Sequence, residues 1–320
     1  MTIEAKPARS FLADVDYTTS PVEDALNSVC HPNFKPTAAA FLANIKNAES
    51  LLQLPHSLLM LAHVETQKLL VFTDVYLPVF YKGGRYEDID TRKIVDEEFA
   101  KRMDQLRTSQ DFKDELITAS DSRMAQLLEG GDMQKKIRMV LLSLVSATWT
   151  AFEVLAGDAW RFALNNRPDL TAQRVLQQLF PHTTAEGLSA KGIPVWLAAQ
   201  YGFDLRSHIG DILKSRIDFS DIGEIRKAYR AAFGEIAELE KHLGDRRLLI
   251  LESTRHVIVH RGGTVDEKYN HLTNKNFEIG RPLPLEPTFL SDALRAGIAA
   301  GCAINIESGG TPGNPTSFRR

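Results

Sequence analysis

The chain has 320 residues and a mass of 35.7 kDa; 43% of the residues are hydrophobic and 25% are charged. This composition is typical of a globular protein and excludes a wholly disordered or collagen-like chain. At roughly 150 residues per domain, the length predicts about two domains. The formal net charge of −3 excludes a surface that is basic throughout, so any nucleic-acid binding requires a local patch.

Cysteine usage and the apolar runs predict a soluble, cytoplasmic protein. Cys30 and Cys302 lie far apart and form no C-x-x-C motif, which excludes a disulfide scaffold and a zinc ribbon; two free thiols are expected. The first seventeen residues contain no apolar run of the kind found in secretory signals. The longest uncharged stretch, 139–152, is shorter than the roughly 20 residues of a membrane span and predicts a buried core helix.

Helical periodicity dominates the first part of the chain. Residues 1–34 are interrupted by prolines and are expected to form a partly ordered lead-in. Residues 37–79 are rich in Ala and Leu and predict two helices, with Pro55 in a first turn and Pro78 at the end.

The following segment, 91–128, is charged with sparse apolar positions, which predicts an exposed amphipathic helix or a pair of helices. We expect 35–130 to be an N-terminal helical region, whose role the sequence does not indicate.

A helical domain is expected over 131–307, beginning at the Gly130-Gly131 pair, with a disordered tail over 308–320. Its helices are expected at about 133–165, 171–180, 205–216, 221–243, 246–260 and 291–304, with an irregular stretch over 264–290. In the last helix, the spacing of Gly297 and Gly301 permits close contact with a neighbouring helix. The chain is therefore expected to be all-α.

The helix expected at 133–165 carries two stripes, so it should contact neighbours on two sides. One stripe is apolar, and the other includes Trp149, Glu153 and Trp160. The two tryptophans are expected in the core rather than as platforms for base stacking. Glu153 is open to three interpretations: a buried partner of an arginine such as Arg255, a site carboxylate, or an exposed side chain.

The most informative polar pattern lies at 253–269, because the common nucleotide, metal and hydrolase motifs are absent. Arg255, His256, His260 and Arg261 end an apolar helix, and two glycines then let the chain turn away. His256 and His260 are four residues apart, on nearly the same helix face. Because an arginine is rarely buried without a partner, Arg255 is expected to face a cleft, an anion or a carboxylate.

Two other interpretations of these residues stay open. Arg255 and His260 could be a structural pair near the negative end of the helix dipole. His256 and His260 could be metal ligands, although no third ligand is evident nearby in sequence.

The Arg-x4-His pair of Arg255 and His260, closing the last core helix of an all-α domain, resembles the HEPN superfamily. The polar residue after the arginine, here His256, and the continuation H-R-G-G-T-V-D-E-K-Y add to the resemblance, as does the helix at 146–160. The resemblance covers about 135–305.

The resemblance implies an endoribonuclease that needs no metal or cofactor, in a toxin, defence or stress system. Arg255 would bind the phosphate, His260 would act as general base or acid on the ribose 2′-OH, and His256 would orient the site. Glu153, Arg261 and Tyr269 are the supporting residues, with Tyr269 expected to fix the loop. The expected products are a 2′,3′-cyclic phosphate and a 5′-OH.

The resemblance also implies partners. Catalytic members act as dimers, so a homodimer through 133–165 and 246–260 is expected, together with an RNA substrate and an antitoxin or other partner protein. No membrane partner is expected. Other members are non-catalytic RNA- or protein-binding modules, and a structural helical protein without a ligand is the third possibility.

Residues 226–261 hold eight Lys and Arg against five Asp and Glu. This local net charge of +3 predicts a basic face for RNA, formed by Arg230, Arg246 and Arg247. The alternative is that these arginines are ordinary solvated side chains.

Overall fold

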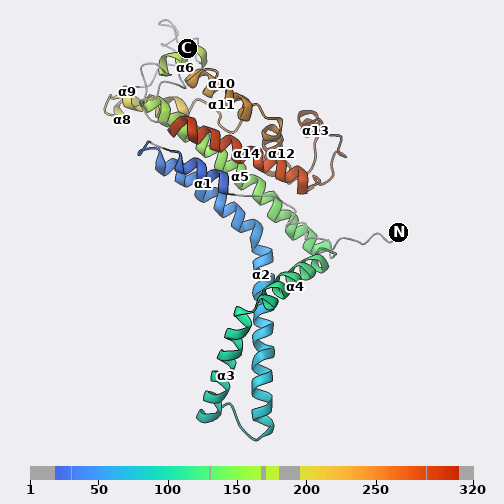
Figure 1. Cartoon of the computed structure of the whole chain (residues 1–320). Coiled ribbons are helices and arrows are strands. Elements are labelled where there is room, and N and C mark those ends of the chain that lie inside the picture. Colours follow the sequence, from blue (N-terminus) through green and yellow to red (C-terminus); the bar gives the residue numbers. More distant parts are fainter. Residues whose placement is uncertain are drawn as a thin grey trace. The chain divides into compact units, whose positions relative to one another are not determined.

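The structure, a computed structural model, describes residues 19–29, 31–129, 131–166, 171–179, 195–285 and 287–309 (Figure 1). In these residues, 82% of the chain is helical and no strand occurs. The described part contains one isolated antiparallel bridge, between Thr264 and Pro282. The prediction of an all-α fold is confirmed.

Thirteen helices lie in the described ranges. They are α1 (Ser20–Asn27), α2 (Lys35–Tyr81), α3 (Ile89–Thr108), α4 (Gln110–Glu129), α5 (Gly131–Asn166), α6 (Gln173–Leu179), α8 (Val195–Gln200), α9 (Leu205–Lys214), α10 (Ile222–Phe233), α11 (Ala237–Leu243), α12 (Arg246–Arg261), α13 (Glu267–Thr273) and α14 (Pro287–Gly309).

The chain divides into two compact units. Among the described residues, one unit, which we call the hairpin unit, comprises 52–129 and 131–138; the other, the core unit, comprises the described residues of 19–51 and of 139–309. This division differs from the single boundary expected at Gly130-Gly131, because α2 and α5 each continue as helix from one unit into the other. Gly131 begins α5 instead of marking a linker.

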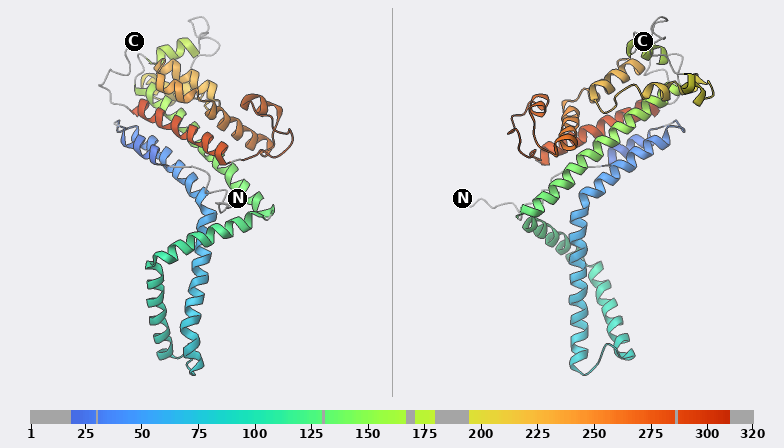
Figure 2. Two further views of the ribbon diagram at one scale, coloured as in Figure 1. Left: turned by 45° about the vertical axis from the view of Figure 1, so that its right-hand side comes forward. Right: turned by 180° about the vertical axis from the view of Figure 1, so that it is seen from behind.

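In the hairpin unit, the second part of α2 runs beside α3 (Figure 2). The Phe72 ring lies 6.0 Å from the Phe99 ring, measured between centroids, and Val95 and Met103 of α3 are buried. The charged segment predicted as one or two helices is a pair, since the backbone becomes extended at Ser109, between α3 and α4.

The expectation of two helices over 37–79 is wrong, because α2 continues through Pro55 and Pro78. A proline inside a helix removes one backbone hydrogen bond and crowds the preceding turn, at a cost of about 3 kcal/mol. Leu52 and Val75 are buried close to the two prolines, so side-chain packing on these turns offsets that cost.

The core unit is built around α5 and α14, which run side by side in Figures 1 and 2. Trp149 and Trp160 are both fully buried, which confirms their predicted place in the core. The Trp160 Nε1 donates to the carbonyl of Ala228 at 2.9 Å, and the Tyr229 hydroxyl donates to the carbonyl of Ala156 at 2.8 Å. These bonds fix α10 against α5.

Helix α14 makes the close contacts that its glycine spacing predicts. A Cβ added at Gly301 would lie 2.3 Å from the ring of Phe41, and one at Gly297 would lie 2.6 Å from Leu251. Phe41 lies in the first part of α2, within the core unit. Both contacts exist only because these two residues have no side chain.

Two further elements differ from expectation, and the partly ordered lead-in contains one helix. The helix predicted over 221–243 is split into α10 and α11 at Gly234, whose φ of 81° ends α10. The stretch expected to be irregular contains α13. The lead-in contains α1, which packs on α14, and 1–18 lie outside the described residues. Of the tail expected to be disordered over 308–320, Ser308 and Gly309 belong to α14, and 310–320 lie outside the described residues.

Two helical segments, Gln134–Asn166 and Thr288–Ser308, are long and apolar enough to cross a membrane; 56% and 72% of their apolar windows are buried inside the chain. Cys302, in the second segment, is a free thiol whose pKa burial raises to about 12, and Cys30 lies outside the described residues.

Candidate active site

Helix α12 presents the candidate residues, and its sequence fixes both of its ends. The Asp245 carboxylate caps the N-terminus by accepting a hydrogen bond from the Arg247 N–H at 2.8 Å. Gly262, with a φ of 61°, ends the helix in the left-handed conformation. Leu248, Leu251 and Val257 are buried together with Ser253 and Thr254, whereas Glu252, Arg255 and His256 are only partly buried.

Arg255 is held by a carboxylate from α5. Its guanidinium lies 3.9 Å from Glu153 Oε2, and the two side chains are 25% and 28% exposed. Burial raises the pKa of Glu153, and the positive charge of Arg255 opposes that rise. Of the three interpretations of Glu153, the structure supports the arginine partner.

His256 and His260 lie next to each other, with ring centroids 4.5 Å apart and planes inclined by 47°. His256 is half-buried and His260 is exposed in the last turn. Burial lowers the pKa of His256, and the positive charges of Lys268, His260 and Arg255 lower it further, while Asp266 opposes them. The His256 imidazole is therefore neutral at pH 7, and its ring can accept a hydrogen bond at one nitrogen and donate at the other.

Glu252 belongs to the same face of α12, one turn before His256, and sequence analysis missed it. Burial raises its pKa to about 7, and the negative charge of Asp221 acts in the same direction, while Lys268 opposes both. The four-residue spacing from His256 was visible in the sequence. The contact with the start of α10, which buries the carboxylate, was not.

Asp218 adds a second missed carboxylate to the surroundings of Arg255. Hydrogen bonds from Ser220 lower the pKa of Asp218, and Arg255 contributes in the same direction. The Asp218 side chain accepts from the Ser220 backbone N–H at 2.9 Å. Arg255 thus lies in the field of two carboxylates, Glu153 and Asp218, which reduces its excess positive charge.

The supporting residues have structural contacts. The Arg261 Nε lies 3.5 Å from Asp266 Oδ2, and Asp266 also caps α13 by accepting from the Tyr269 N–H at 2.8 Å. Tyr269 is buried, its hydroxyl lies 3.2 Å from Thr254 Oγ1, and burial raises its pKa to about 12. Tyr269 therefore stabilises the turn after α12 from the buried side, in agreement with the expectation that it fixes the loop.

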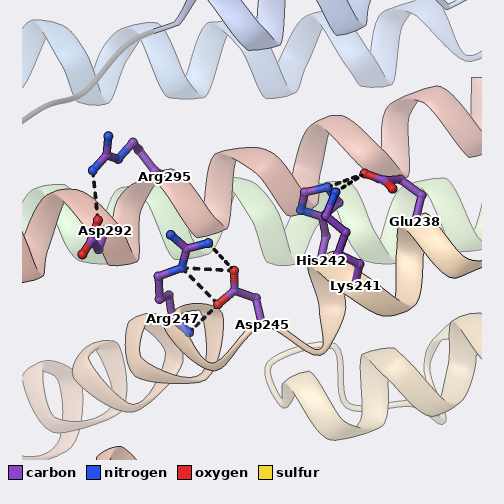
Figure 3. A network of polar contacts seen from close by, with 7 residues as sticks. All are labelled: Glu238, Lys241, His242, Asp245, Arg247, Asp292 and Arg295. Atoms are coloured by element: carbon purple, nitrogen blue, oxygen red, sulfur yellow. Dashed lines mark hydrogen bonds and ion pairs between the residues drawn. The ribbon is translucent and has the colours of Figure 1, made fainter.

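The three arginines predicted to bind RNA are engaged within the chain. Arg247 forms an ion pair of 2.7 Å with Asp245 (Figure 3), and Arg230 forms one of 2.7 Å with Glu240. The Arg246 guanidinium donates to the carbonyl of Thr273 at 3.4 Å. Two of the three charges are thus balanced locally, and their role in RNA binding stays a prediction.

No group of three or more His, Cys, Asp or Glu side chains placed to hold a metal ion occurs in the described part of the chain. The structure thus supplies no third ligand for His256 and His260 from this part.

Comparison of the chain with family models, with curated protein sequences and with solved structures finds no match.

Proposed function

We propose that the protein is a metal-independent endoribonuclease of HEPN type, acting in the cytoplasm as a toxin, defence or stress ribonuclease. The observation that supports this proposal is that Arg255, His256 and His260 lie in the last two turns of α12, with the His256 ring beside that of His260 and Arg255 beside Glu153. An arginine and a histidine are sufficient for phosphodiester cleavage when the substrate supplies its own nucleophile, the ribose 2′-OH.

In this mechanism His260 removes the proton of the 2′-OH, and the 2′-oxygen attacks the adjacent phosphorus. The bond from phosphorus to the 5′-oxygen breaks, and the protonated His260 returns the proton to that oxygen as it leaves. The products are a 2′,3′-cyclic phosphate and a 5′-OH. Because His260 is exposed, it can reach a substrate bound on the surface. His256, neutral at pH 7, orients the site.

Arg255 stabilises the charge that develops on the phosphate oxygens. A guanidinium has five N–H donors, so it can keep its contact with Glu153 and still donate to a phosphate. Glu153 holds the guanidinium in place. A side chain that is already held loses less entropy when the phosphate binds, so the ion pair favours binding.

The central experiment compares His260→Ala with His271→Ala, which removes an exposed histidine of α13. We expect His260→Ala to lower the rate of RNA cleavage by about 10² to 10⁴, the usual contribution of one acid–base group, and His271→Ala to leave it unchanged. The assay uses labelled RNA in EDTA, with identification of the cyclic phosphate.

Three results would contradict the mechanism: cleavage that survives His260→Ala, cleavage that requires added zinc or magnesium, and cleavage of DNA or of RNA methylated at the scissile 2′-OH. If the wild type cleaves no RNA, the alternative is a non-catalytic RNA- or protein-binding module. Gel-shift titration with the same RNA then distinguishes these two kinds of partner.

A further inference from the structure

Lys268 of α13 differs from the other cations around α12 because no carboxylate holds it. Residues 222–275, all of which the structure describes, contain ten Lys and Arg. Nine of them contact a carboxylate, a backbone carbonyl or an aromatic ring: Arg226, Lys227, Arg230, Lys241, Arg246, Arg247, Arg255, Arg261 and Lys275. Lys268 forms no ion pair or hydrogen bond with another described residue, and its side chain is exposed. Its charge is therefore available to a ligand.

Contacts on both sides of Lys268 place it beside the last two turns of α12. Helix α13 packs on α12 (Figure 1). Two residues before Lys268, Asp266 lies 3.5 Å from the Arg261 Nε, and one residue after it, the Tyr269 hydroxyl lies 3.2 Å from Thr254 Oγ1. Tyr269 is buried while Lys268 is exposed, so the ammonium lies on the solvent side of α13.

The charge of Lys268 reaches the candidate active site. Burial has the largest influence on the pKa values of His256 and Glu252, and Lys268 adds a smaller influence that lowers both. Burial still keeps the pKa of Glu252 at about 7, so this carboxyl is only partly ionised at pH 7. Glu252 therefore balances the charge of Lys268 only in part.

A phosphate that binds at Arg255 brings a negative charge that the arginine alone does not balance. Arg255 already lies in the field of Glu153 and Asp218, which reduces its excess positive charge. Every nucleotide of RNA adds a phosphate, and affinity for the strand comes largely from cations that neutralise these charges. Lys268 supplies such a cation without giving up an ion pair.

We propose that Lys268 binds a phosphate of the RNA strand next to the one at Arg255, so that α12 and α13 together hold the substrate. This inference rests on the proposed ribonuclease function, whose RNA contacts it extends to α13. It also differs from the expectation that the basic face is formed by Arg230, Arg246 and Arg247, all of which have partners within the chain. An ammonium binds phosphate as a point charge and reads no base, so the contact adds affinity without sequence preference.

The test compares Lys268→Gln with Lys241→Gln in the full chain. Each variant loses one positive charge, but Lys241 lies on α11 and already pairs with Glu238 at 3.0 Å. Fluorescence anisotropy measures the binding of a labelled single-stranded RNA of about 20 nucleotides, between about 0.05 and 0.3 M salt. The RNA is methylated at every 2′-OH, so binding is measured separately from cleavage.

We expect Lys268→Gln to raise the dissociation constant about fivefold at about 0.1 M salt and to reduce the slope of log affinity against log salt by about 0.7, the loss of one phosphate contact to a single strand. Lys241→Gln should leave the dissociation constant within about twofold of the wild type. On unmethylated RNA, Lys268→Gln should raise KM by the same factor and leave kcat unchanged, because the contact is made equally in the ground state and the transition state.

The role of Lys268 is overturned if both variants bind the methylated RNA equally well, if the wild type does not bind it, or if Lys268→Gln lowers kcat and leaves KM unchanged. A wild type that cleaves RNA with the same KM as Lys268→Gln overturns this role alone and leaves the ribonuclease proposal intact. Weaker binding by Lys268→Gln, together with a wild type that cleaves no RNA, supports the phosphate contact and contradicts the ribonuclease proposal instead.

Discussion

At the scale of single residues, partial burial shifts the pKa values of titratable groups on α12. Glu252 and His256 lie one turn apart and both lose hydration, so burial favours the neutral form of each: it raises the pKa of the acid and lowers the pKa of the base. The shift of Glu252, to a pKa of about 7, brings the titration of that carboxyl into the physiological range of pH, whereas the lowered pKa of His256 keeps that imidazole neutral there.

The carboxyl of Glu252 makes the stability of the fold depend on pH. Its pKa in the folded chain is about 7 against 4.5 in the unfolded chain, so the folded state binds the proton more tightly. Stability from this group is present below pH 4.5 and is lost as the pH rises through 7. Glu252→Gln should therefore raise the free energy of unfolding at pH 8 by at most about 3 kcal/mol and change it little at pH 4.5.

Urea unfolding at the two pH values measures this effect. Glu278→Gln, at an exposed carboxylate paired with Arg281, is the control and should show no comparable dependence on pH. His256 affects the free energy of unfolding in the opposite direction: because its pKa is lowered, stability is lost as the pH falls below about 6.5. Wild type and Glu252→Gln share this contribution, so it cancels in the comparison. An equal effect of Glu252→Gln at pH 4.5 and pH 8 would contradict the assignment.

Removing Arg255 should destabilise the protein more than removing His260. Arg255→Ala leaves the half-buried Glu153 carboxylate without its positive partner, so the pKa of Glu153 rises further and the free energy of unfolding at pH 7 falls by about 1–3 kcal/mol. His260 is exposed, and His260→Ala should change stability by no more than about 0.5 kcal/mol.

The added substitution Glu153→Gln should recover most of the stability lost in Arg255→Ala, since it removes the uncompensated charge. Denaturant unfolding of the three variants tests this. If Arg255→Ala and His260→Ala unfold at the same denaturant concentration, the ion pair contributes nothing measurable.

Some of these residues could be predicted from the sequence. Arg255 and Glu153 each interrupt an apolar helix, and the cost of burying either alone predicts that they meet. Glu252 was missed because its burial comes from residues of another element, around Asp221. The partners of Arg230 and Arg247, in contrast, lie within the same segment, where a count of net charge conceals the pairing.

At the scale of elements, helices with strong periodic stripes were predictable, and prolines and short helices were not. The stripes of α5 predict a helix because their large apolar members, Trp149 and Trp160 among them, are buried along its length. Pro55 and Pro78 suggested helix ends, but the local preference of a proline yields to burial of the neighbouring turns. Helix α13 has only seven residues, too few to show a period, and its capping by Asp266 is the local feature that indicates it.

Gly301 sets the distance between α14 and the first part of α2. Alanine is the better helix former by about 1 kcal/mol, but its Cβ would lie 2.3 Å from the Phe41 ring, and overpacking costs about 1–3 kcal/mol. Gly301→Ala should therefore lower the melting temperature.

Gly131→Ala is the matched control for Gly301→Ala, because nothing lies within 4 Å of the added Cβ and the melting temperature should stay the same or rise. Thermal unfolding of both variants by circular dichroism measures the difference. A rise in melting temperature for Gly301→Ala would show that the core can adjust at this contact.

At the scale of the whole molecule, helical periodicity predicted the all-α class and the length predicted about two domains, but neither showed where the chain divides. The hairpin unit is an insertion within the core unit, entered through α2 and left through α5. Domain boundaries usually lie in loops or at glycines, but here each boundary lies inside a helix. Only contacts between distant segments, such as Phe41 with Gly301, show which residues share a core.

The packing of α1 on α14 also bears on how the protein is made. The first and last helices of the described chain belong to one core, so α1 leaves the ribosome long before its partner is synthesised. During that interval its apolar side chains, Val22 and Ala25, have no final contact to bury them. A chain that stops before residue 287 can never complete this core, so an unfinished product stays open to proteases that a finished one resists.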